Sequence, residues 1–266
     1  MILAAHPVAD PSAPLARRNP VAKLAAALLF SLPLVATLDP LTPAIALAIE
    51  LAVVPLFGVR YSTLARRAWP VLIASLGLLV TMVLFSATRT GTPLLDLGPF
   101  DVTTGVLISA LGLVLRLFAV AIPGVLVFAT TDPTDLADAL VQNAKASPRF
   151  AIGALAAFRL LPLLGQEWQM LTLARRARGI DAGRNPLAAA RLFVSTAFAM
   201  LVGALRRGGR LAVAMDARGF DSGLPRSYAR RQIFRPADTA LVVGALALSS
   251  LTLGITITLG LFRSII

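Results

Sequence analysis

Long apolar stretches alternate with short polar segments along most of this chain. Five of them come close to the roughly 20 apolar residues that a membrane-spanning helix needs. They cover residues 24–38, 41–58, 69–88, 106–130 and 237–262. The segment 89–104 is polar and contains Gly, Pro and Asp, so we expect an external loop there. The pattern predicts an all-α integral membrane protein with about five transmembrane helices.

Between the fourth and fifth stretches the pattern changes, because charged residues now interrupt the apolar ones. Three helices are predicted here, over residues 133–143, 148–178 and 186–218. Each begins with Pro, which suits the first turn of a helix. The mixed polarity favours cytoplasmic or interfacial helices, with the two long ones crossing. Two additional spans, giving seven in all, are the alternative for the long pair.

The chain is therefore divided into four segments. Residues 1–20 form a cytoplasmic N-terminal leader, and residues 21–130 hold transmembrane helices 1–4. Residues 131–235 form a cytoplasmic coupling region, and residues 236–266 hold the last transmembrane helix. The leader lacks an apolar core of the length that a signal peptide requires.

The composition agrees with a membrane protein. Hydrophobic residues make up 57% of the chain and charged residues 14%, and the mean hydropathy is +0.81. Soluble domains contain about 25% charged residues. The chain has no Cys and a single His, His6. Disulfides, thiolate metal sites and His-based metal or proton sites are therefore excluded.

The net charge of +12 is concentrated in residues 133–235, which contain 16 of the 25 Lys and Arg residues but 6 of the 13 Asp and Glu residues. Basic segments beside membrane spans face the cytoplasm and anionic lipid. We therefore place the N-terminus inside and, with five spans, the C-terminus outside. Nucleic acid is not expected as a partner, because apolar helices interrupt the basic residues and aromatic stacking partners are lacking.

Ten residues of the coupling region recur forty positions later. Residues 174–183, ARRARGIDAG, align with residues 214–223, AMDARGFDSG, and six positions are identical. The identical residues include two motifs and the Asp and Gly after each: Ala177-Arg178-Gly179 with Asp181 and Gly183, and Ala217-Arg218-Gly219 with Asp221 and Gly223. A duplicated cationic helix end indicates two matching contacts with a partner rather than one catalytic centre.

In both copies Gly follows a helix and an apolar residue, Ile180 or Phe220, follows the Gly. This order is typical of a Schellman cap, in which Gly adopts the left-handed conformation. Arg178 and Arg218 then lie where a cation complements the helix dipole. The cap explains the Gly and the apolar residue, but it does not require Arg and Asp at matching places. A guanidinium held in one direction suits bidentate pairing with a carboxylate.

Two charged residues, Glu50 and Arg116, lie inside predicted spans. Charges at that depth are costly and indicate a functional site by default. The two residues could form an intramembrane ion pair. Bundle-facing groups, snorkelling side chains, and substrate or proton handling are the alternatives.

The chain lacks the residues that several kinds of chemistry require. A phosphate-binding P-loop requires Gly-x-x-x-x-Gly-Lys-Ser/Thr. The two lysines, Lys23 and Lys145, neither follow Gly nor precede Ser or Thr. Metal-ligand spacings and a Ser–His–Asp set are also lacking in the sequence. We therefore expect a protein with no catalytic residue, cofactor or metal of its own.

At the two Ala-Arg-Gly motifs the chain resembles the transmembrane T component (EcfT/CbiQ-like) of energy-coupling factor (ECF) transporters. These are ATP-binding-cassette (ABC) importers of vitamins and transition-metal ions. The segment 19–24, NPVAKL, is similar to the family's Asp-Pro-Arg-x-Lys-Leu start of span one, with Asn19 in place of Asp and Val21 in place of Arg. The segment 130–140, TTDPTDLADAL, looks like its Thr-Thr-x-Pro-x-x-Leu-x-x-Ala-Leu element.

The resemblance implies a non-catalytic protein of a bacterial or archaeal cell membrane. The two motifs would end two crossed coupling helices, each docked in an acidic groove of one of two ABC-type ATPase subunits, which bind the ATP. A separate membrane-embedded S component would bind the vitamin or metal ion. The chain would then be the scaffold that links ATP hydrolysis to movement of the S component.

Two other functions are weighed against this one. A self-contained secondary transporter or channel is the alternative that Glu50 and Arg116 motivate, and a membrane-embedded enzyme is the third. The residues before the two motifs also differ, Arg175-Arg176 in the first copy and Met215-Asp216 in the second. This difference indicates two different sockets, or identical sockets with different rims.

Overall fold

The computed structural model describes residues 10, 12–37, 39–85, 92–97, 100–220 and 227–260. These residues divide into two units. The smaller unit comprises Pro148–Arg231, and the larger unit comprises Ala5–Ser147 together with Gln232–Ile266. Between residues 10 and 260 the chain therefore leaves the larger unit once and returns to it once.

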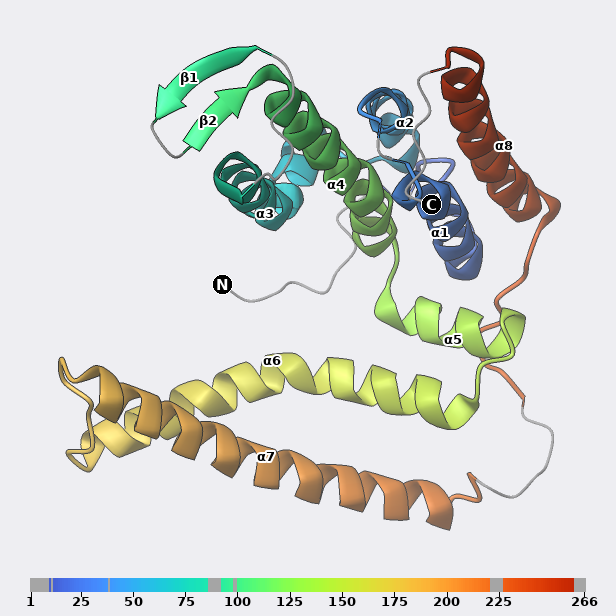
Figure 1. Cartoon of the computed structure of the whole chain (residues 1–266). Coiled ribbons are helices and arrows are strands. Elements are labelled where there is room, and N and C mark those ends of the chain that lie inside the picture. Colours follow the sequence, from blue (N-terminus) through green and yellow to red (C-terminus); the bar gives the residue numbers. More distant parts are fainter. Residues whose placement is uncertain are drawn as a thin grey trace. The chain divides into compact units, whose positions relative to one another are not determined.

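The larger unit is helical apart from one β-hairpin (Figure 1). Its elements in chain order are α1 (Pro20–Val35), α2 (Leu41–Val53), the 3₁₀ turn η1 (Val54–Phe57), α3 (Tyr61–Phe85), β1 (Pro93–Leu97), β2 (Phe100–Thr103), α4 (Thr104–Thr130), α5 (Pro133–Asn143) and α8 (Pro236–Thr258). α1 packs against α8 and α4, and α4 also packs against α2 and α3. α4 is thus the central helix of this unit.

The smaller unit contains α6 (Pro148–Ala177) and α7 (Pro186–Ala217), joined by residues 178–185. The two helices contact each other. They cross in the view of Figure 1, near the loop that connects them. The rings of Trp168 and Phe193 contribute to this contact, with centroids 5.2 Å apart.

The helices begin at sequence signals that the chain repeats. Pro lies in the first turn of α1, α5, α7 and α8. In three of these helices the side chain of the preceding residue accepts a hydrogen bond from a backbone N–H: Asn19 from Val21 at 2.9 Å, Asp132 from Thr134 at 2.7 Å, and Asn185 from Leu187 at 3.0 Å. Such caps satisfy N–H groups that have no partner inside the helix.

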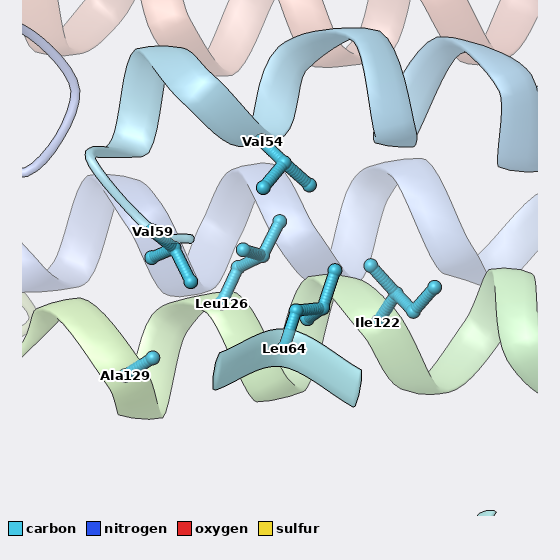
Figure 2. Close-up of a cluster of buried hydrophobic side chains, with 6 residues drawn as sticks. All are labelled: Val54, Val59, Leu64, Ile122, Leu126 and Ala129. Carbon is cyan, nitrogen blue, oxygen red and sulfur yellow. The ribbon is translucent and has the colours of Figure 1, made fainter. Parts of the chain in front are cut away.

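Two clusters of buried apolar side chains hold α4 against its neighbours. Figure 2 shows the first, which consists of Val54, Val59, Leu64, Ile122, Leu126 and Ala129. The three members from α4 follow helical spacing and so share one face, against η1 and the start of α3. The second cluster consists of Phe30 and Leu34 of α1, Ala46 of α2 and Ala119 of α4. The apolar core of the larger unit is therefore built along α4.

The predicted fold class, an all-α membrane protein, is confirmed. By length and composition, five of the described helices could cross a membrane, namely α3, α4, α6, α7 and α8. The number agrees with the prediction, but the membership differs. α6 and α7 qualify, whereas α1 and the segment formed by α2 and η1 are shorter apolar helices. The turn at Asp39-Pro40 separates these two short helices.

Two predicted boundaries were wrong. α3 begins at Tyr61 rather than at residue 69, because Arg66 and Arg67 continue the helix as part of its first turns. Arg is a good helix former, and a basic run beside an apolar stretch does not mark a loop by itself. The segment 89–104, predicted as a loop, contains the antiparallel strands β1 and β2, with Leu97 opposite Phe100.

Candidate functional site

The first Ala-Arg-Gly motif closes α6 with a Schellman cap. The Ile180 N–H donates to the Arg175 carbonyl at 3.0 Å, and the Gly179 N–H donates to the Arg176 carbonyl at 2.9 Å. These two bonds define the motif. Gly179 has φ +77°, which is in the left-handed region.

The second motif closes α7 in the same way. The Phe220 N–H donates to the Met215 carbonyl at 3.1 Å, and the Gly219 N–H donates to the Asp216 carbonyl at 2.9 Å. Gly219 has φ +70°. Both predicted caps are therefore confirmed, and Gly is needed in each because a side chain disfavours a positive φ.

The caps present Arg178 and Arg218 in equivalent positions. Each Arg directly follows the last helical residue, and both side chains are exposed. A cation there complements the partial negative charge of the helix C-terminus. The two ends are therefore matched, exposed and cationic, as the repeat in the sequence predicts.

The two cationic ends lie at opposite ends of α7. Residues 178–185 lead from α6 into the start of α7, whereas Arg218 follows the last residue of α7. α7 has 32 residues, so at about 1.5 Å per residue it is about 48 Å long. Two ends separated by that distance can contact two different partner subunits at the same time.

Arg175 fastens the end of α6 to α7, a role that the sequence analysis did not assign. Its Nη1 donates to Thr196 Oγ1 at 2.7 Å and to the Leu192 carbonyl at 3.3 Å, and its Nη2 donates to Ser195 Oγ at 2.8 Å. Met215 occupies the equivalent position in the second copy and cannot make such bonds. A hydroxyl pair on a predicted neighbouring helix is the only signal in the sequence for this contact.

A salt bridge joins the same two helices farther from the loop. Glu167 of α6 accepts a hydrogen bond from Arg207 of α7. A Cβ at Gly203 would lie 3.4 Å from the Glu167 carboxylate, so this carboxylate lies against α7 at Gly203. Arg175 and this salt bridge hold α6 and α7 together as one pair.

The residues that follow the first motif shape the connecting loop. Asp181 Oδ1 accepts a hydrogen bond from the Ala182 N–H at 2.8 Å. Gly183 has φ +53°. Their counterparts in the second copy, Asp221 and Gly223, lie outside the described residues, so their supporting role stays a prediction.

Glu50 and Arg116 do not contact each other in the structure. Arg116 Nη1 donates to the carbonyl of Thr37 at 2.8 Å. Glu50 is 6% exposed. Neither of its carboxylate oxygens has a hydrogen-bond partner among the described residues. The direct ion pair is therefore not formed, and Arg116 instead satisfies a carbonyl beyond the end of α1.

These features define a multi-pass helical membrane protein with two equally capped cationic helix ends. Residues 11–228 match the CbiQ family, described as cobalt transport protein. The match covers most of the chain, and the chain belongs to this family. The resemblance to an EcfT/CbiQ-like T component is thereby confirmed.

Curated relatives agree with this membership. The chain is 27% identical to the energy-coupling factor transporter transmembrane protein EcfT of Bacillus subtilis over 214 residues, which cover 75% of this chain and 81% of that protein. It is 30% identical to EcfT of Leuconostoc gelidum over 172 residues, 60% of this chain and 63% of that protein. It is also 29% identical to a putative ABC transporter ATP-binding protein of Bifidobacterium longum over 248 residues, 87% of this chain and 31% of that protein.

Proposed function

We propose that this chain is the transmembrane scaffold and energy-coupling subunit of an ECF-type ABC importer. The pair of cationic helix ends is the observation that carries the proposal. Arg178 and Arg218 each project from a rigid cap, and a guanidinium in a fixed direction suits a carboxylate on a partner. Each Ala-Arg-Gly motif docks with one of two ABC-type ATPase subunits.

The chemical step belongs to those partners. ATP is bound and hydrolysed by the ATPase subunits, and this chain is a non-catalytic subunit without a cofactor of its own. The relative from Bifidobacterium longum, named as an ATP-binding protein, contains a segment similar to 87% of this chain. A single polypeptide of that kind supports a lasting association between the two kinds of protein.

The substrate, a vitamin or a transition-metal ion, is bound by a separate membrane-embedded S component. Many apolar side chains of α6 and α7 are exposed, among them Phe150 at 81% and Leu187 at 78%. Exposed apolar surface of this extent favours a protein or lipid partner. When the ATPase pair closes, the two helix ends move with it, and α6 and α7 carry the movement to the S component.

The orientation follows from the basic residues. The coupling region of residues 131–235 faces the cytoplasm, where the ATPases and ATP are, and the N-terminus lies on the same side. With five spans the C-terminus lies outside. The other exposed arginines of the coupling region contact anionic lipid headgroups, and nucleic acid is not a partner.

Affinity purification from the native membrane tests the proposal. The wild-type chain should recover one or two kinds of P-loop ATPase together with a small hydrophobic protein. The double variant Arg178→Glu/Arg218→Glu should recover no ATPase, because each end now repels an acidic groove. The matched control is Arg206→Glu/Arg210→Glu, which makes the same charge change at exposed positions within α7. ATPase recovered with the first double variant would overturn the proposal.

A liposome assay separates this function from its alternative. A self-contained secondary transporter would move substrate when this chain alone is reconstituted and an ion gradient is applied. The scaffold function predicts no transport until the ATPases, the S component and ATP are added.

A further inference from the structure

Four buried polar residues meet at one end of the larger unit, where α4 ends and α8 begins. They are Asn19, Lys23, Thr130 and Asp238, and their exposures are 6%, 3%, 7% and 2%. We call this group the polar junction. None of its members is needed for the contacts proposed above, since all four belong to the larger unit.

Lys23 of α1 holds the end of α4. Its Nζ donates to the Thr130 carbonyl at 2.9 Å, to Thr130 Oγ1 at 3.3 Å and to the Ala16 carbonyl at 3.2 Å. Thr130 is the last residue of α4, so its carbonyl has no partner within the helix. A cation at a helix C-terminus is also favoured by the helix dipole.

Asp238 of α8 holds the start of α1. Its Oδ1 accepts a hydrogen bond from the Asn19 N–H at 3.0 Å, and its Oδ2 accepts one from the Arg235 N–H at 2.7 Å. Asn19 and Arg235 are the N-cap residues of α1 and α8. One carboxylate therefore joins two helix N-termini, where negative charge is stabilised. Asp135 of α5 attracts the Lys23 ammonium electrostatically, and Asp238 does so to a smaller extent.

The polar junction lies on both connections between the two units. The chain leaves the larger unit after α4 and α5, and it returns at Gln232, just before α8. The Gln232 N–H donates to Gln142 Oε1 of α5 at 2.9 Å, which ties the returning segment to the outgoing one. The outgoing and returning segments are thus bonded to each other. The end of α4 and the start of α8 are in turn bonded to the start of α1.

Buried charges are costly to desolvate, and apolar residues of similar size often stabilise a fold equally well. We infer that Lys23 and Asp238 are positioning residues that clamp the outgoing and returning connections onto α1. When the smaller unit is displaced, α1, α4 and α8 of the helical bundle then move together as one rigid body. This inference rests on the proposed function and adds the route by which the movement reaches the bundle.

Spin labels across the polar junction test the clamp. Because the chain has no Cys, labels can be placed at Ala144→Cys, beyond α5, and Ala240→Cys, on α8, both of which are exposed. With the polar junction unaltered, the distance between the two spin labels should have one narrow distribution. Lys23→Met should broaden it about twofold, because a buried charged contact is broken. The matched control is Lys145→Met, which removes the only other lysine and lies beside a label.

The nucleotide dependence tests the coupling role. In the purified complex with its ATPases, the unaltered junction should give the same distance without nucleotide and after trapping with ATP and vanadate. With Lys23→Met the distance should shift on trapping, while ATP hydrolysis stays within about twofold of the wild-type rate, because both cationic ends are intact. A narrow, unchanged distribution with Lys23→Met in every state overturns the clamp.

The remaining outcomes are also decisive. If Lys23→Met broadens the distribution equally in all nucleotide states, the polar junction is structural and the coupling role is overturned. If the wild-type chain recovers no ATPase, the proposed function fails, but the measurement on the chain alone still decides the clamp. Asp238→Asn, which keeps the side-chain size and removes the charge, replaces Lys23→Met if that variant does not fold.

Discussion

The two cationic helix ends have the same kind of cap, but they differ in how they contact the neighbouring helix. Gly179 and Gly219 adopt the same left-handed conformation and close the same pair of backbone bonds. The α6 end is then braced against α7 by Arg175, whereas Met215 stands at that position before the α7 end. The repeated residues therefore set the direction of each Arg, and residues outside the repeat set how firmly each end is held.

Charge reversal at each end separately should give the largest difference. The α6 end keeps the exposed Arg176 when Arg178 is reversed, but the α7 end has Asp216 at the equivalent position. We expect Arg218→Glu to weaken binding of a purified ATPase subunit at the α7 end about 100-fold, and Arg178→Glu to weaken it at the α6 end about tenfold, while the unaltered end of each variant binds as before. Surface plasmon resonance on the chain in nanodiscs measures both. Equal losses would show that the neighbouring charges do not take part.

Removing the contacts that Arg175 makes with α7 should have a smaller effect than charge reversal. Arg175→Met gives the α6 end the residue found at the α7 end and removes three hydrogen bonds to α7. The free energy of unfolding should fall by about 2 kcal/mol, since bonds from a charged donor are stronger than neutral ones but these are partly exposed. Thermal unfolding in detergent measures it, with Arg176→Met as the control. A loss no greater than that of the control would contradict the brace.

Adding a side chain at the Gly of either cap should lower the stability of the protein by the same amount. Gly179→Ala and Gly219→Ala should each lower the free energy of unfolding by about 1 kcal/mol, because φ is positive at both positions. Gly58→Ala should cost more than either, because φ is also positive there and the new Cβ would lie 2.7 Å from Cβ of Ala13. Unequal effects at the first two positions would show that the caps are not equivalent.

The smallest effect is expected for the salt bridge between Glu167 and Arg207. Its side chains are 30% and 26% exposed, so solvent screens the attraction. A double-mutant cycle with Glu167→Gln and Arg207→Gln should give a coupling free energy below about 1 kcal/mol. A larger value would mean that this pair, rather than Arg175, dominates the contact between α6 and α7.

The features that could be predicted from the sequence are local ones. A Schellman cap needs a Gly and the apolar residue after it, so both helix ends could be located from a few neighbouring residues. The starts of α5, α6 and α7 were likewise marked by Pro133, Pro148 and Pro186. Apolar length alone does not separate the prediction of coupling helices from the alternative of two more spans, because α6 and α7 are both long and apolar enough to cross a membrane.

The features that were missed depend on partners far away in the sequence. The sequence analysis interpreted Arg175 only as a difference between the two helix ends, because the residues that it contacts, Ser195 and Thr196, lie on another helix. The sequence analysis assigned no tertiary contact to Lys23 or Asp238, yet both are buried and bonded across the bundle. Glu50 and Arg116 were considered as a pair because both are charged, but the fold turns Arg116 toward the Thr37 carbonyl. Periodicity does not reveal such tertiary contacts.

Native mass spectrometry of the complex purified from its own membrane tests the central claim most directly. The account predicts two ATPase subunits on the wild-type chain, one on Arg178→Glu, one on Arg218→Glu and none on the double variant. Two ATPase subunits retained on the double variant, at wild-type abundance, would contradict the claim that these two helix ends are the docking sites.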